Sequence, residues 1–111
     1  MNQADLPLAA QQYFDLMDGP DKSLVVAVFA PDAVVLDDGH TYTGHREIRG
    51  WLTGPASEFT TTSTWLSATH TADTAAAVIE IAGDFPGSPV ILHYRFTMDA
   101  TGLISGLEIA P

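Results

Sequence analysis

Apolar residues recur at three- and four-residue spacings over residues 5–18, a pattern typical of a helix that buries one face. The Gly19-Pro20 pair is expected to end this helix. The apolar positions after Asp21 predict a second, short helix that ends at Pro31. The Asp21 carboxylate lies near the start of that helix, where a negative charge is favoured. The chain is therefore predicted to begin with two helices.

The rest of the chain predicts strands around one further helix. Residues 33–37 form an apolar run rich in β-branched side chains, typical of a strand, and residues 38–43 predict a turn or short hairpin. A third helix is predicted over residues 44–52, ending near Gly54 and Pro55. Strands are then expected at residues 60–71, 75–85, 90–98 and 103–109.

The connections between the later strands are short and polar, and they are too short for the helical crossovers of a parallel sheet. Helices followed by strands predict the α+β class, with three N-terminal helices packed on a curved, mainly antiparallel sheet. We expect a cone with an internal pocket. At 111 residues the chain is long enough for one hydrophobic core, so a single domain over residues 1–111 is predicted.

Composition and charge narrow the classes of partner. Hydrophobic residues make up 46% of the chain, and four basic against fourteen acidic residues give a net charge of −10. Such a charge repels phosphate backbones and anionic lipid surfaces, so neither nucleic acid nor a membrane is an expected partner. No leader and no membrane-spanning segment are recognised, and a cytoplasmic location is expected. The absence of cysteine excludes thiolate nucleophiles and cysteine-ligated metal sites.

Asp37 is the first candidate for chemistry because it closes the apolar run of the first strand. An ionisable side chain that points from a strand toward a core is costly unless it is paired, hydrated or used. Asp38 faces the opposite side, since strand side chains alternate, so the two carboxylates do not form an acid dyad. Asp37 is either a general base in an apolar pocket or a cap on the turn through the amides of Gly39 and His40.

Tyr13, on the inner face of the first helix, is either a hydrogen-bond donor to an oxyanion or a tyrosine that fills the core. A set of apolar side chains could line a pocket for a small apolar ligand or form a simple core: Phe14, Met17, Phe29, Val35, Trp51, Trp65, Leu92, Tyr94 and Phe96. His40 and His45 match no established metal-ligand spacing, so neither a metal nor a cofactor is expected.

Two motifs resemble a known family. Residues 28–34 read Val-Phe-Ala-Pro-Asp-Ala-Val before the first strand, and residues 44–49 read Gly-His-Arg-Glu-Ile-Arg at the start of the third helix. With the order of elements, they resemble the SnoaL-like proteins of the nuclear transport factor 2-like superfamily over nearly the whole chain. The resemblance implies a cystatin-like cone. It leaves the chemistry open, because the superfamily includes isomerases, cyclases, epoxide hydrolases and binding modules.

Within that superfamily the functional analogy is to ketosteroid isomerase. The resemblance implies that Tyr13 donates to a developing enolate oxygen and that Asp37 moves the proton. In that enzyme a protonated aspartic acid, the second oxyanion donor, precedes a His-aromatic-Arg-Phe run; here the run is residues 93–96 and the corresponding residue is Leu92. Loss of one such donor costs on the order of 10²–10³ in turnover, so efficient steroid isomerisation is not expected.

The sequence leaves two functions open. One is an enzyme that binds a small apolar molecule and catalyses cofactor-free proton transfer of the isomerase or cyclase type, with Asp37 as base and Tyr13 as donor. The other is a non-catalytic ligand-binding or dimeric scaffold module, and a homodimer through the open sheet face is expected in either case. An open cavity with both groups on its wall favours the enzyme, whereas a cavity filled by Trp51, Trp65 and Phe96 favours the module.

Overall fold

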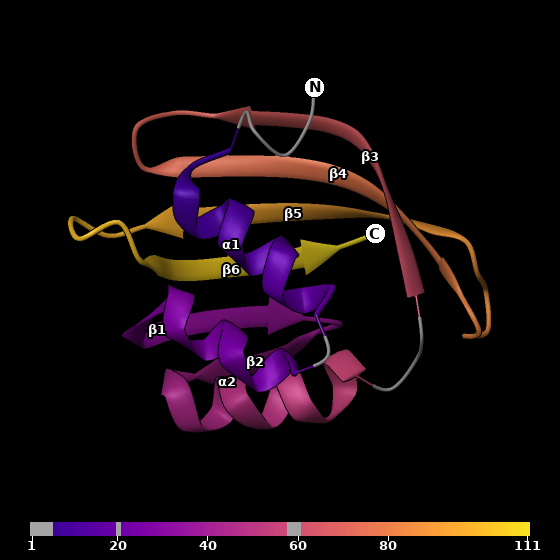
Figure 1. Ribbon diagram of the computed structural model, residues 1–111, viewed down its shortest axis with the longest axis horizontal. Coiled ribbons are helices and arrows are strands. Elements are labelled where there is room, and N and C mark those ends of the chain that lie inside the picture. Colours follow the sequence, from indigo (N-terminus) through magenta and orange to yellow (C-terminus); the bar gives the residue numbers. More distant parts are fainter. Residues whose placement is uncertain (1–5, 20, 58–60) are drawn as a thin grey trace.

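The computed structural model describes residues 6–19, 21–57 and 61–111 (Figure 1). Its elements follow in the order α1 (Leu8–Met17), η2 (Lys22–Val28), β1 (Phe29–Asp37), β2 (His40–Thr43), α2 (Gly44–Thr53), η3 (Pro55–Ser57), β3 (Thr61–His70), β4 (Thr74–Gly83), β5 (Val90–Met98) and β6 (Ile104–Ala110), where η denotes a 3-10 helix. The predicted α+β class is confirmed. The predicted boundaries at residues 5 and 60, and Pro20, lie outside the described residues.

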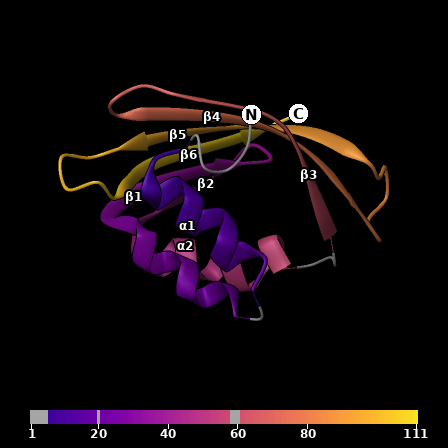
Figure 2. The same ribbon diagram turned by 45° about the horizontal axis from the view of Figure 1, so that its top comes forward.

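All the strands form one six-stranded sheet in the order β2-β1-β6-β5-β4-β3. The β1–β6 pair is parallel and the other neighbours are antiparallel, which confirms a mainly antiparallel sheet. Figure 2 shows the sheet curving over α1 and α2, with the first part of β3 bending toward the helices. A register shift between Trp65 and Ser67 accompanies that bend. The helices therefore cover one concave face, as a cone requires.

The start of β1 differs from the prediction. The second helix is a 3-10 helix that ends before Phe29, and Pro31 lies inside β1 instead of ending the helix. Phe29 pairs with Ile104 and Val34 with Gly106, so the register shifts between these two pairs. Proline has no N–H to donate to a ladder, and a bulged segment is one place where a strand accommodates it.

The turn after β1 sets the direction of the two neighbouring carboxylates. Asp38 has a φ of 52° and Gly39 a φ of 75°, the left-handed pair that a tight hairpin turn needs. Asp37 pairs with His40 across the hairpin. Asp37 is half-buried and ends β1, whereas Asp38 is exposed and lies in the turn.

The hydrophobic core lies between the helices and the concave face of the sheet. Its largest fully buried side chains are Trp51, Tyr13, Phe29, Phe96, Ile48, Leu52, Ile79, Ile104, Val25 and Val35. On β5 the side chains of His93 and Arg95 are exposed, on the face opposite Tyr94, as predicted. The homodimer through the open sheet face stays a prediction. In the described ranges, no helix has the length and apolar character to cross a membrane.

Two isoleucines allow a matched comparison of how much each face of the sheet contributes to the free energy of unfolding. Ile79 on β4 is fully buried, whereas Ile91 on β5 is 47% exposed. Ile79→Ala is expected to lower the free energy of unfolding by about 2–5 kcal/mol, through lost burial and the cavity that remains. Ile91→Ala is expected to lower it by less than about 1 kcal/mol. Urea unfolding of both variants measures the difference, and equal losses would contradict this position of the core.

Candidate functional site

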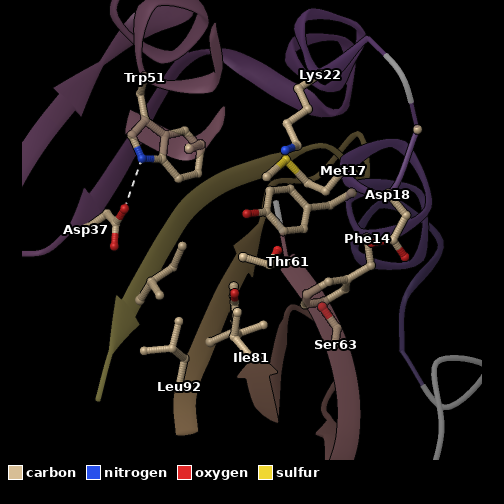
Figure 3. Close-up of a pocket in the computed structure, with 15 residues that line it drawn as sticks. Phe14, Met17, Asp18, Lys22, Asp37, Trp51, Thr61, Ser63, Ile81 and Leu92 are labelled. Atoms are coloured by element: carbon tan, nitrogen blue, oxygen red, sulfur yellow. Dashed lines mark hydrogen bonds between the residues drawn. The ribbon is translucent and has the colours of Figure 1, made fainter. Parts of the chain in front are cut away.

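A cavity of about 410 Å³ opens between the helices and the concave face of the sheet (Figure 3). This volume lies within the range of about 300–1,000 Å³ that is usual for small-molecule sites. Its apolar wall consists of side chains from α1, η3, β4, β5 and β6, namely Phe14, Met17, Ala56, Ile81, Leu92 and Ile109. The cavity is therefore open rather than filled by the large aromatic side chains of the core.

The Asp37 carboxylate lies on the cavity wall and accepts a hydrogen bond from the Trp51 indole. The distance from Trp51 Nε1 to Asp37 Oδ2 is 3.0 Å. Helical spacing places Ile48, Trp51 and Leu52 on the buried face of α2, which packs beside β1. Trp51, only 1% exposed, thus fixes the carboxylate at the end of β1.

Two tyrosines share the cavity with Asp37. Tyr13 comes from α1 and Tyr94 from β5, and their ring centroids are 6.5 Å apart. Burial raises the pKa of the Tyr13 hydroxyl well above its ordinary value, and Tyr94 and the negative charge of Asp37 raise it further. Burial, with the charges of Asp37 and Asp18, likewise raises the pKa of the Tyr94 hydroxyl. Both groups are therefore neutral hydrogen-bond donors at physiological pH.

Neither tyrosine hydroxyl has a hydrogen-bond partner among the residues that the structure describes. The rings are nevertheless held in place. The Tyr13 ring meets Phe96 edge to face at a centroid distance of 5.5 Å and Phe29 at 6.1 Å, and the Phe14 ring meets Tyr94 at 5.2 Å. The donors are thus positioned by aromatic packing and remain available to a ligand.

The predicted pocket residues divide into two groups. Those that line the cavity are Phe14, Met17, Trp51, Leu92 and Tyr94. Those that belong to the core or pack against it are Phe29, Val35, Trp65 and Phe96. Trp65 is not among the lining residues, and its ring meets the Phe14 ring at a centroid distance of 4.6 Å. A role in ligand binding stays a prediction for the first group.

A polar part of the wall was not found by sequence reasoning. Asp18, Lys22, Thr61 and Ser63 line the cavity at the end of α1, the start of η2 and the start of β3. Two signals could have pointed to them. Lys22 is the single lysine of the chain and follows the Gly-Pro break, and Thr61 and Ser63 share one strand face by their spacing of two.

His45 has a structural contact in this part of the fold. Its Nε2 atom lies 2.8 Å from the carbonyl oxygen of Phe29, which ties the start of α2 to the start of β1. Within residues 6–19, 21–57 and 61–111, no group of three or more His, Cys, Asp or Glu side chains could hold a metal ion.

The fold and the sequence together define the family. Residues 10–105 match the family model for the SnoaL-like domain, and the chain belongs to this family. The predicted resemblance is thereby confirmed. No curated protein matches the sequence.

Solved structures of similar proteins agree with this assignment. A candidate polyketide cyclase from Sinorhizobium meliloti is 35% identical, with a TM-score of 0.90 over 99% of this chain and 100% of that chain. A Catenulispora acidiphila protein with a ketosteroid isomerase-like fold, in complex with trimethylamine, is 18% identical, with a TM-score of 0.79 over 95% and 85% of the two chains. A Mycobacterium tuberculosis protein in complex with estradiol-17beta-hemisuccinate is 16% identical, with a TM-score of 0.74 over 94% and 91%. The last two likenesses concern the fold alone.

The two buried tyrosines predict a loss of stability at alkaline pH. Their pKa values are raised in the folded protein, whereas an unfolded chain ionises its tyrosines near pH 10. Above that pH the unfolded state binds fewer protons than the folded state, so the free energy of unfolding falls by roughly 1.4 kcal/mol per pH unit for each tyrosine. Urea unfolding at pH 8 and pH 10.5 measures the fall, which is expected to be smaller in Tyr13→Phe and in Tyr94→Phe. If the fall is the same in the wild type and in both variants, the two buried tyrosines are not its cause.

Proposed function

We propose that this SnoaL-like protein binds a small, mainly apolar carbonyl compound and catalyses cofactor-free proton transfer beside the carbonyl group, of the isomerase or cyclase type. The proposal rests on the observation that Asp37, Tyr13 and Tyr94 line the same cavity. There the Asp37 carboxylate, held by the Trp51 indole at 3.0 Å, lies with the hydroxyls of Tyr13 and Tyr94. A base and two donors are the groups that enolisation needs.

In the proposed reaction the Asp37 carboxylate takes a proton from the carbon next to the substrate carbonyl. The electron pair of that C–H bond moves into the carbonyl group, and negative charge develops on its oxygen. Tyr13 donates a hydrogen bond to this oxygen. If a C=C bond is conjugated with the enolate, the proton returns from Asp37 to another carbon, which is an isomerisation. Alternatively the enolate carbon attacks a second carbonyl of the same molecule, which is a cyclisation, and the alkoxide formed there takes the proton from Asp37, which regenerates the carboxylate.

Tyr94 is the proposed second donor. The position that resembles the missing donor is Leu92, which lines the cavity without a polar atom. Tyr94 follows two residues later on β5 and faces the same side of the sheet. Its raised pKa keeps the hydroxyl neutral, so it can stabilise an enolate by a hydrogen bond rather than by losing its own proton.

The similar structures support a small-molecule ligand and leave its identity open. The neighbour from Sinorhizobium meliloti is a candidate polyketide cyclase, and its 35% identity extends over nearly the full length of both chains. This favours a cyclase-type substrate, in which an enolate forms a bond to another carbonyl carbon. The more distant neighbours in complex with trimethylamine and with estradiol-17beta-hemisuccinate use the same fold to hold small molecules.

The proton-transfer step can be measured without knowing the natural substrate. The wild-type protein is expected to accelerate hydrogen–deuterium exchange at the carbons beside the carbonyl of 2-tetralone, followed by proton NMR in D₂O. Asp37→Asn should remove on the order of 10²–10⁴ of this acceleration because the base is lost. Tyr13→Phe should remove on the order of 10²–10³ because one donor to the oxyanion is lost.

Asp38→Asn is the matched control, because it neutralises the exposed carboxylate next in the chain and is expected to leave the exchange rate unchanged. An equal loss in Asp38→Asn and Asp37→Asn would overturn the assignment of the base. If the wild-type protein binds 2-tetralone without accelerating exchange, the non-catalytic binding module replaces the enzyme as the function.

Binding itself has an internal control in the two tryptophans. Trp51 lines the cavity, whereas Trp65 contacts Phe14 and is not among the lining residues. Titration of 2-tetralone into nitrogen-15-labelled protein is expected to shift the indole N–H resonance of Trp51 more than that of Trp65, and Trp51→Phe assigns the signals. A larger shift at Trp65 would mean that the compound binds elsewhere.

A further inference from the structure

Several elements contribute polar side chains to the cavity wall. Asp37, with its Trp51 partner, comes from the end of β1, and Lys22 comes from the start of η2. Asp18, Thr61 and Ser63 also line the cavity. Figure 3 shows the Lys22 side chain extending from its helix toward Met17, on the far side of Trp51 from Asp37. Among the described residues, the cavity wall thus carries one cation, Lys22, together with the carboxylates of Asp18 and Asp37.

Lys22 is an unpaired cation inside this cavity. It is half-buried, and within the described ranges it has neither an ion pair nor a hydrogen bond from its side chain. The other cations lie elsewhere: Arg46 and Arg49 are exposed on α2, and Arg95 pairs with Glu108 at 3.4 Å. A partly desolvated ammonium group without a partner favours an anionic ligand. The chain has a net charge of −10, so its overall surface charge repels anions. An anion that binds in the cavity would therefore depend on the local charge of Lys22.

We propose that the ligand of the cavity is an amphipathic anion, an apolar molecule with one oxyanion group such as a carboxylate, and that this group binds the Lys22 ammonium. Thr61 and Ser63 supply hydroxyl donors beside it. The apolar body lies along Phe14 and Leu92, and the opposite end reaches the Asp37 carboxylate. This deepens the proposed function, on which it rests, because the charge fixes which end of the substrate meets the base.

Repulsion by the Asp37 carboxylate sets the orientation of the ligand. An oxyanion near Asp37 would meet a like charge in a poorly solvated site, so the anionic group is directed to Lys22 and the neutral carbonyl end to Tyr13. Asp18 lines the same part of the wall as Lys22 and weakens the attraction for an anion. Lys22 and Asp18 are therefore expected to act in opposite directions on the choice between a charged and a neutral ligand.

Two fluorescent probes that differ by one sulfonate test this choice. They are 8-anilinonaphthalene-1-sulfonate, which is an anion, and N-phenyl-1-naphthylamine, which has the same aromatic body without the charge. The measured quantity is the ratio of their dissociation constants, anion over neutral, for the wild type and each variant. Lys22→Gln removes the cation, Lys22→Arg keeps it, and Asp18→Asn removes the opposing charge. Arg46→Gln is the matched control, since it makes the same change of net charge on the exposed surface of α2.

Lys22→Gln is expected to raise the ratio roughly threefold to tenfold, the range for a partly exposed charge-assisted contact. Lys22→Arg and Arg46→Gln are expected to leave it near the wild-type value, and Asp18→Asn to lower it. If the ratio moves equally in Lys22→Gln and Arg46→Gln while the neutral probe still binds, the role of Lys22 is overturned and the proposed function stands. If neither probe binds the wild-type protein, both proposals are overturned.

Discussion

The hydrogen bond from Trp51 Nε1 to Asp37 Oδ2 is the interaction on which the candidate site depends. A half-buried carboxylate loses part of its solvation and needs a polar partner. The partner here is an indole that is itself 1% exposed, on a helix whose buried face packs beside β1. One side chain therefore fills the core and fixes the carboxylate. The packing of α2 and the position of the Asp37 carboxylate therefore cannot be changed independently.

The two tyrosines that line the same cavity are held by a different means. Tyr13 and Tyr94 bury their rings among other aromatics, with Tyr13 meeting Phe14 at 5.0 Å and Tyr94 stacking on Phe96 at 6.4 Å. Such contacts orient the rings, and the hydroxyls are left at the cavity. The cost of burying a phenol is low when it stays neutral, and the raised pKa of both groups reflects that preference. A neutral phenol at the cavity can donate a hydrogen bond to a ligand.

The sequence predicted those parts of the structure that depend on periodicity. The alternation in residues 90–98 gave the bounds of β5 and its two faces, and the spacing in α2 placed Trp51 inside. Periodicity tells which side chains are inside, but not which of them border a void, so Phe29 and Phe96 were grouped with residues that line the cavity. Pro31 was interpreted as a helix stop because the bulge that accommodates it depends on pairing with the distant β6. Lys22 was missed because its position depends on how β3 curves toward η2.

The proposed second donor, Tyr94, also affects which substrates the cavity would accept. In the enzyme that the chain resembles, the donor occupies the position of Leu92, whereas the phenol here comes from Tyr94, the next inward-facing residue of β5. Two residues along a strand correspond to a shift of about 7 Å. A tyrosine side chain is longer than that of an aspartic acid and can recover part of the shift. The carbonyl oxygen that both tyrosines could reach would then lie in a different place relative to Asp37. If Tyr94 acts as the second donor, this rearrangement favours a different set of substrates over weaker isomerisation of the same ones.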